Sequence, residues 1–301
     1  YDGRSRNLGL KQSGNTVLRL ATPETGEIVV NDLIRGQVVF NNSELDDLIL
    51  LRSDGTPTYH LCNVVDDFEQ KVTTVIRGED HLSNTPRQIH IQKALGYPPL
   101  EYAHLPLVLG PDKKRLSKRH DATGLEEYQS KGYLDSAILN TLARLGWSKG
   151  DQEVFYMNDL IKNFNIVDIQ KAGAVFDRTK LDWLNTQHLA NLTLPEIKDQ
   201  LKPYLNDLSI DIDNHFKADL LIDSMRSSAS TLRGIAEDLV PYYKNVTEYN
   251  ENAINKFIDE EGLKILKELK LILNQLESWD VNSLDKILGD YQKENNCPVP
   301  K

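Results

Sequence analysis

Cysteine is scarce in this chain, which has two in 301 residues. Cys62 and Cys297 lie far apart, and neither has a C-x-x-C partner or a histidine-rich neighbourhood. Such a pair gives no basis for a disulfide framework, and structural zinc sites use closely spaced cysteine or histidine ligands. We therefore expect no disulfide and no metal centre, and the composition fits a reducing compartment, the cytoplasm.

Long hydrophobic runs are missing as well. The longest, such as residues 48–51, fall far short of the ~20 apolar residues that a membrane-spanning helix needs. The first residue, Tyr1, is neither an initiator methionine nor the start of a charged-then-apolar leader. We expect a chain without membrane segments, long enough for two or more domains, and we interpret it as part of a longer protein.

Positive charge is in deficit overall, because the formal net charge is -10, yet it is concentrated at one place. Five of the seven residues 113–119 are lysine or arginine, directly after the apolar segment 105–110. Cations on a loop bounded by glycine and proline can close over a polyphosphate and stabilise the charge that develops on pyrophosphate. The competing interpretation of any such run is a solvated surface turn.

The pattern around residue 57 changes from short β-like segments with turns to a β-α-β arrangement. We predict a helix over 59–66, a buried strand over 72–78, and a strand over 105–110. A helix over 86–95 is expected to have Thr85 as its N-cap and Gly96 just past its end. In doubly wound sheets ligands gather beyond the carboxyl ends of strands, so residues 77–80 and the basic loop are predicted to share a site.

From about residue 190 the chain is predicted to be all helical. Thr193 and Glu196 form a capping box in the sequence, with Pro195 near the first helical position. Leucine and isoleucine then recur with a near-helical period up to about residue 291. The acidic stretches between them are best interpreted as solvated faces.

Three motifs follow one another in the chain: residues 59–67, YHLCNVVDD; residues 77–86, RGEDHLSNTP; and residues 115–119, RLSKR. Residues 115–119 are similar to the signature loop of the class I aminoacyl-tRNA synthetases, and all three motifs resemble the glutamyl branch of that class. Arg115 stands where the signature has lysine, with Lys113 and Lys114 beside it. The resemblance implies an α/β fold, the C-terminal half of a Rossmann-type core followed by an all-α anticodon-binding region.

The resemblance also divides the chain into four parts. Residues 1–55 would end an inserted β-containing module that cradles the tRNA acceptor end, and 56–123 would form the second half of the catalytic domain. Residues 124–189 would be a stem-contact connecting domain, and 190–301 an incomplete helical anticodon-binding domain. The first half of the nucleotide-binding fold would lie upstream with its His-x-Gly-His signature, so we expect the fragment alone to be inactive.

The resemblance assigns the candidate site residues. The ATP site would comprise Lys118, assisted by Lys114 or Arg115 in neutralising pyrophosphate, with Ser117 and the backbone edge at Leu107 and Val108 beneath adenine. Mg²⁺ would accompany ATP without a dedicated protein cage.

The glutamate site would comprise Tyr59 and Asn63, one helical turn apart, and Arg77, whose guanidinium can hold a carboxylate bidentately. A basic pair, Arg178 and Lys180, would contact tRNA phosphates, although core packing explains that segment equally well.

The implied activity is ligation of L-glutamate to the 3′ end of tRNA(Glu) through a glutamyl-adenylate, with release of AMP and pyrophosphate, by a monomer. Three alternatives stay open. A paralogue that glutamylates a modified tRNA base would lack the helices after residue 190, and a glutaminyl enzyme would have β-barrels there. An RNA-binding module without catalysis would lack the upstream signature. Charging of tRNA(Gln), and a requirement for tRNA in activation, also stay open.

Overall fold

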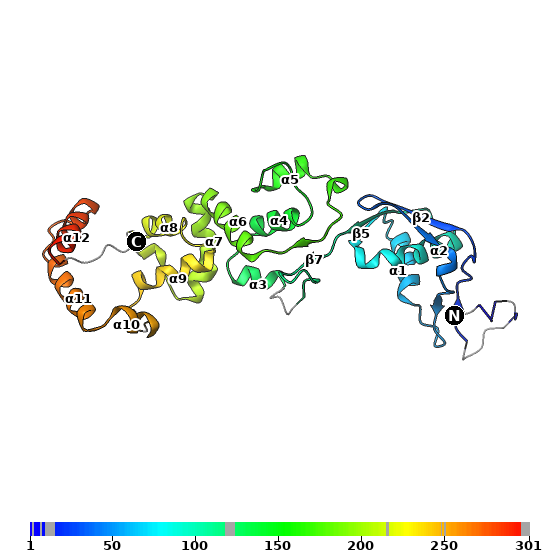
Figure 1. Cartoon of the computed structure of the whole chain (residues 1–301), viewed down its shortest axis with the longest axis horizontal. Coiled ribbons are helices and arrows are strands. Elements are labelled where there is room, and N and C mark those ends of the chain that lie inside the picture. The colour runs from blue at the N-terminus through cyan, green and yellow to red at the C-terminus, as the bar shows by residue number, and fades with distance from the viewer. Residues whose placement is uncertain are drawn as a thin grey trace. The chain divides into compact units, whose positions relative to one another are not determined.

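The computed structural model describes residues 1, 3–6, 8–9, 16–117, 124–214, 217–247, 249 and 251–295. The chain divides into two compact units, Tyr1–Leu239 and Val240–Lys301. Figure 1 shows the chain from the N-terminal strands to the C-terminal helices. None of the described helices has the length and apolar character needed to cross a membrane.

The largest sheet of the described residues, which lies in the first unit, has four strands in the order β3-β2-β6-β5. Its strands are β2 (Glu27–Asp32), β3 (Gly36–Asn41), β5 (Thr74–Gly78) and β6 (Glu101–Leu105). β2 and β3 form an antiparallel hairpin, whereas β6 runs parallel to both of its neighbours. The sheet joins strands from both sides of residue 55, so the boundary predicted there runs through one continuous sheet.

The helices α1 (Tyr59–Glu69) and α2 (Thr85–Leu95) lie beside this sheet (Figure 1). Ile28 and Val30 of β2 are buried with Tyr102 of β6, and partly buried residues of β3, β5 and α2 pack against them. Alternation along β2 also turns Asp32 to the buried side, because side chains two apart in a strand share a face. The predicted α/β class is confirmed.

The start of α2 differs from the prediction. A 3₁₀ helix, η2 (Glu79–Asn84), runs directly into it, so Asn84 is the N-cap position and Thr85 is the first helical residue. The Thr85 hydroxyl is fully buried and accepts a hydrogen bond from Arg77 instead of capping the helix. The predicted end is confirmed, because Gly96 adopts φ 70°, which glycine tolerates without a Cβ penalty.

The strand predicted over 105–110 is two strands in two different sheets. β6 ends at Leu105, and β7 (Val108–Leu109) pairs in parallel with β8 (Ala174–Val175). Pro106 separates them because it has no backbone N–H with which to continue a ladder. A third small sheet pairs β1 (Leu18–Arg19) with β4 (Ile49–Leu51).

Helices follow the strands in the rest of the first unit. Ile34 and Ala103 from the sheet region pack in one core with Trp147, Phe155, Leu160 and Ile169 of the connecting segment. The predicted capping box is confirmed, because the Glu196 carboxylate accepts the Thr193 backbone N–H at 2.7 Å. The bounds are α3 (Leu125–Ser130), α4 (Asp135–Arg144), α5 (Met157–Asn163), α6 (Arg178–Asn191), α7 (Leu194–Asp207) and α8 (Ala218–Met225). The next helix, α9 (Leu232–Tyr243), begins in the first unit, and its residues 240–243 belong to the second.

The second unit contains α10 (Glu251–Phe257), α11 (Glu260–Leu273) and α12 (Val281–Asn295). Asp259 caps α11, where its carboxylate accepts the Gly262 backbone N–H at 2.8 Å. Tyr291 of α12 donates a hydrogen bond to Glu268 of α11 at 2.8 Å, which joins the two helices. The all-helical character predicted after residue 190 is confirmed in the described residues.

Candidate active site

Arg77 lies at the carboxyl end of β5 and is held along one edge of its guanidinium group. Nε donates to His104 Nε2 at 3.1 Å, and Nη2 donates to Thr85 Oγ1 at 2.8 Å. Burial lowers the pKa of Arg77, although Tyr102, Tyr59 and Asp67 act in the opposite direction. Because arginine is not deprotonated in proteins, Arg77 is still a cation, and its remaining N–H groups point away from His104 and Thr85.

The predicted partners of Arg77 lie on α1. Tyr59 is 52% exposed, and its electrostatic influence on Arg77 places the two side chains in one neighbourhood. The Asn63 Oδ1 atom and the His60 Nδ1 atom on the same helix are both buried, and neither has a hydrogen-bond partner among the described residues. Unpaired buried acceptors are costly and call for a ligand or water. This part of α1 therefore has an unpaired amide oxygen, at Asn63, and an unpaired ring nitrogen, at His60.

The loop after β7 reverses the chain tightly. The Gly110 N–H donates to the Lys114 carbonyl at 2.8 Å, and Asp112 accepts the Lys114 N–H at 2.9 Å. Arg115 pairs with Leu109 in an isolated antiparallel bridge. The side chains of Lys114, Arg115 and Ser117 are exposed, so this part of the loop presents its cations to solvent.

Arg115 is tied to the segment that follows β5. Its Nη1 lies 2.8 Å from Asp80 Oδ2, although the Arg115 side chain is 67% exposed. The structure thus brings the basic loop next to Asp80, although the loop follows a strand of the β7-β8 sheet and not of the sheet that contains β5, as the prediction assumed. Lys118, the predicted second signature lysine, lies outside the described residues, so its catalytic assignment stays a prediction.

The backbone edge predicted to lie beneath adenine is engaged in part. The Leu107 N–H donates to Glu79 Oε1 at 3.0 Å, and the Val108 carbonyl accepts the Leu116 N–H at 2.8 Å. The same Glu79 carboxylate forms an ion pair with Arg35. Leu107 and Val108 are therefore held next to the basic loop, with the Leu107 N–H and the Val108 carbonyl already hydrogen-bonded.

Arg178 and Lys180 begin α6, which Asp177 caps by accepting the Thr179 N–H at 2.9 Å. Arg178 donates from Nε to the Tyr133 hydroxyl at 3.2 Å and lies over the Tyr128 ring. Lys180 forms an ion pair with Glu153 at 2.7 Å. Both cations border a pocket of about 1050 Å³ whose other lining residues include Pro111 and Leu116 of the basic loop.

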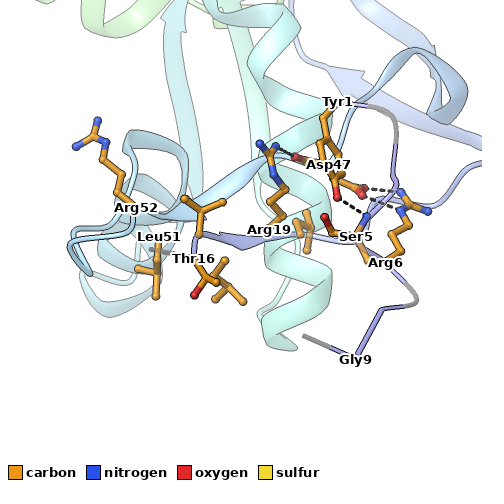
Figure 2. A pocket seen from close by; sticks show the side chains of 13 residues that line it. Tyr1, Ser5, Arg6, Gly9, Thr16, Arg19, Asp47, Leu51 and Arg52 are labelled. Atoms are coloured by element: carbon orange, nitrogen blue, oxygen red, sulfur yellow. Dashed lines mark hydrogen bonds and ion pairs between the residues drawn. The ribbon is translucent and has the colours of Figure 1, made fainter. Parts of the chain in front are cut away.

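A second pocket, of about 630 Å³, lies between β1 and β4 near the start of the chain. In Figure 2 dashed lines join Arg6 to the Asp47 carboxylate, Arg19 lies to one side of Tyr1 and Asp47, and the Arg52 side chain points away from them. Arg6 Nε donates to Asp47 Oδ2 at 2.7 Å, and Arg19 Nη1 donates to the Asp47 carbonyl at 2.7 Å. This arginine-lined pocket escaped sequence reasoning, because its arginines lie up to 46 residues apart.

The described residues contain no group of three or more histidine, cysteine, aspartate or glutamate side chains that could hold a metal ion. A divalent cation at this site would need ligands from a bound polyphosphate, which is how Mg²⁺ commonly enters nucleotide sites.

Two family models match consecutive parts of the chain. Residues 4–183 match the catalytic domain of "tRNA synthetases class I (E and Q)", and residues 189–301 match an anticodon-binding domain. This chain belongs to the class I tRNA synthetases of the E and Q type. The predicted recognition is thereby confirmed, and the second match begins close to the boundary predicted at residue 190.

Individual relatives agree with this membership. The synthetase chain is 43% identical over 306 aligned positions to a glutamate–tRNA ligase of Thermodesulfovibrio yellowstonii, covering 99% of the chain and 65% of the relative. It is 42% identical to glutamate–tRNA ligase 1 of Nitrosococcus oceani, covering 96% and 62%. The chain therefore spans less than two thirds of the length of these relatives.

A solved structure has the same fold. The crystal structure of a glutamate–tRNA ligase from Elizabethkingia meningosepticum, in complex with its amino acid, matches with a TM-score of 0.78 and 29% identity. The match covers 99% of this synthetase chain and 65% of that chain. It supports the α/β core followed by helices as the family fold.

Sequence reasoning found Arg77 but not the contacts that hold it in the synthetase chain. Asp32, Thr85 and His104 are buried polar residues behind Arg77. The available signal was the alternation of β2, which puts Asp32 on the same face as Ile28 and Val30. An acidic residue on a core face is rarely left without a partner, and that rule pointed to a buried network.

Proposed function

We propose that the protein to which this chain belongs is an ATP-dependent glutamate–tRNA ligase, which forms glutamyl-adenylate and passes the glutamyl group to the 3′ end of tRNA(Glu). The observation that carries the proposal is the match over 99% of the chain to a protein named glutamate–tRNA ligase. The anticodon-domain match over residues 189–301 disfavours a base-modifying paralogue, and the helices there disfavour a glutaminyl enzyme.

Arg77 is the proposed anchor of the amino acid. Its guanidinium is partly buried and charged, so it can bind a substrate carboxylate in a charge-assisted, bidentate way. The unpaired Asn63 Oδ1 supports a second contact, because an amide oxygen accepts from a substrate ammonium group. Tyr59, one turn away on α1, closes the same side of the proposed pocket.

Activation of the carboxylate requires alignment with the α-phosphate of ATP and stabilisation of the departing pyrophosphate. Lys118 is the proposed main contributor, with Lys114 and Arg115 assisting and Ser117 alongside. The ion pair of Arg115 with Asp80 supports a position of the loop beside Arg77. Adenine would rest against Leu107 and Val108. Mg²⁺ would arrive with ATP, held mainly by its phosphates.

Arg178 and Lys180 are the proposed tRNA contacts, since they border the pocket that the basic loop also lines. Their pairing with Tyr133 and Glu153 means that phosphate binding would exchange one partner for another. The part of the protein before residue 56 is proposed to meet the acceptor end. We further propose a cytoplasmic monomer, in keeping with the family expectation and with a role in protein synthesis.

The proposal is tested by tRNA glutamylation with labelled glutamate and ATP, using the intact gene product. Lys118→Ala is expected to reduce kcat by about 10² to 10³, the loss typical of one contact to developing charge. Lys162→Ala, which removes an exposed lysine from α5, is the matched control and should charge tRNA like the wild type.

Two outcomes would contradict the proposal at different points. Robust charging that Lys118→Ala leaves unchanged would refute the role of the loop. Absence of charging by the intact wild type would refute the ligase function and favour the catalytically inert RNA-binding alternative.

A further inference from the structure

A line of buried polar side chains runs behind Arg77. Asp32, at the end of β2, has 5% of its surface exposed, and His104 on β6 has none. Asp32 Oδ2 lies 2.6 Å from His104 Nδ1, and His104 Nε2 accepts from Arg77 Nε at 3.1 Å. The line therefore starts in the β2–β3 hairpin, passes through the imidazole, and ends on the guanidinium.

The Asp32 carboxylate determines the tautomer of the imidazole. Burial alone would raise the Asp32 pKa, but hydrogen bonds from the Arg35 backbone and from His104 outweigh it and lower the pKa. Burial lowers the pKa of His104 in spite of Asp32. An ionised carboxylate only accepts, so Nδ1 of the neutral ring must carry the proton. Nε2 is then an acceptor, and it is the atom that faces the Arg77 Nε–H.

Asp32 is itself fixed by backbone groups. Its Oδ1 accepts the N–H groups of Ile34 at 3.0 Å and Arg35 at 2.8 Å, and the His104 N–H also donates to the carboxylate. Such an arrangement leaves the carboxylate little freedom to rotate. The β2–β3 turn, and not a surface side chain, therefore fixes the orientation of the His104 imidazole. The imidazole in turn orients Arg77.

The network occupies one edge of the guanidinium and leaves the other. Arg77 has five N–H donors. Nε–H goes to His104 and one Nη2–H to Thr85, whose hydroxyl also lies 3.1 Å from His104 Nε2. In the part of the chain that the structure describes, the other three donors have no recorded protein acceptor. They include the terminal pair, one N–H each on Nη1 and Nη2, which matches the spacing of two carboxylate oxygens.

We propose that Asp32 and His104 are positioning residues of the amino-acid site, which turn the terminal edge of Arg77 toward the substrate carboxylate. The inference rests on the proposed function, because it takes glutamate as the substrate. In metal sites, residues that hydrogen-bond to a metal-binding side chain hold it in the right orientation, and their mutation typically lowers metal affinity by 10- to 100-fold. Asp32 and His104 are proposed to hold Arg77 in the same way. The competing view is that the network only joins β2 to β6.

Two substitutions of His104 separate these views. In His104→Asn the amide reaches only the Nδ1 position, so it keeps the contact with Asp32 and loses the acceptor for Arg77. In His104→Gln the amide oxygen reaches the Nε2 position and keeps that acceptor. His90→Asn is the matched control, because His90 is also buried and is bonded through Nε2 to Asn42 at 2.9 Å, away from Arg77.

The experiment measures KM for glutamate, KM for ATP and kcat in tRNA glutamylation by the intact gene product, with thermal unfolding in parallel. His104→Asn is expected to raise KM for glutamate about tenfold or more, the lower end for an orienting partner, with KM for ATP unchanged. His104→Gln should recover part of the affinity for glutamate, because it keeps the acceptor for Arg77 but loses the contact with Asp32. His90→Asn should lower the unfolding temperature without changing either KM.

The inference is overturned if His104→Asn and His104→Gln behave alike, or if both KM values change together as a general loss of structure would require. Should His104→Asn fail to fold, Thr85→Val against Thr85→Ser tests the same edge of Arg77. Valine removes the acceptor for Nη2 and must raise KM for glutamate selectively, whereas serine must not. A wild type that does not charge tRNA with glutamate refutes the proposed function itself, and the inference with it.

Discussion

Gly132, between α3 and α4, is the position at which a single methyl group is expected to do most damage. It has φ +83°, and a Cβ there would lie 2.3 Å from the backbone nitrogen of Arg233 and 3.0 Å from that of Leu232. The Gly132 carbonyl also accepts the Leu232 N–H at 2.9 Å. The connecting segment and α9 therefore meet backbone to backbone, and no flexible side chain can move aside.

The cost of Gly132→Ala has two parts. An L-residue in the left-handed region costs about 1–2 kcal/mol, and loss of the hydrogen bond to Leu232 adds about 1 kcal/mol. Displaced packing around α9 brings the expected loss to about 3 kcal/mol or more. Gly150→Ala is the matched control: Gly150 has φ +55° and nothing within 4 Å of its Cβ position, so only the conformational part applies.

Thermal unfolding followed by the fluorescence of Trp147 measures the difference. Trp147 is 2% exposed and lies in the first unit, whereas Trp183 and Trp279 are exposed and are replaced by phenylalanine in all variants. We expect Gly132→Ala to lower Tm by roughly 6–12 °C, on a scale of about 2–4 °C per kcal/mol for this size. A loss no larger than that of Gly150→Ala would refute the close contact with α9.

Two further predictions concern acid stability and the basic loop. Burial lowers the pKa of His60, His90, His104 and His188, so the folded state prefers these four side chains neutral. Their contribution to the free energy of unfolding is complete above the unfolded pKa of about 6.5 and is lost as the pH falls through their pKa values in the folded state. Tm should therefore fall between pH 7.5 and 5.5, and less steeply in His188→Gln, whereas equal slopes would contradict this reasoning. Separately, Asp80→Asn should lower Tm by no more than about 4 °C, since an exposed pair contributes at most about 1 kcal/mol. It should nevertheless accelerate tryptic cleavage after Arg115 up to about fivefold, whereas Asp199→Asn should not accelerate it.

Local sequence signals predicted most of the elements. The helices over 59–66 and 86–95 exist, and the first continues to Glu69. The strand ending at Gly78 and the glycine stop at Gly96 also follow from short-range rules. These features depend on residues within one or two turns of each other, which is why a single sequence carries them.

The features that sequence did not predict depend on distant partners. Asp32 is buried only because β2 pairs with β6, some 70 residues later, and His104 lies opposite it. Thr85 resembles an N-cap, yet η2 feeds directly into α2 and turns its hydroxyl to Arg77. Lys180 looked like a tRNA contact, and its pairing with Glu153 depends on how the connecting segment folds back on α6.

The segment that follows β5 holds three parts of the candidate site in one frame. Arg77 is followed by Gly78, the last residue of the strand, and the next residues enter a 3₁₀ turn, in which successive side chains diverge by about 120°. Glu79 consequently reaches the Leu107 N–H, while Asp80 reaches Arg115 of the basic loop. A displacement of this short turn would move the proposed amino-acid anchor, the proposed adenine edge and the loop together. We therefore expect substitutions in the turn to alter KM for glutamate and KM for ATP jointly, in contrast to substitutions of the buried network behind Arg77, which should alter the first alone.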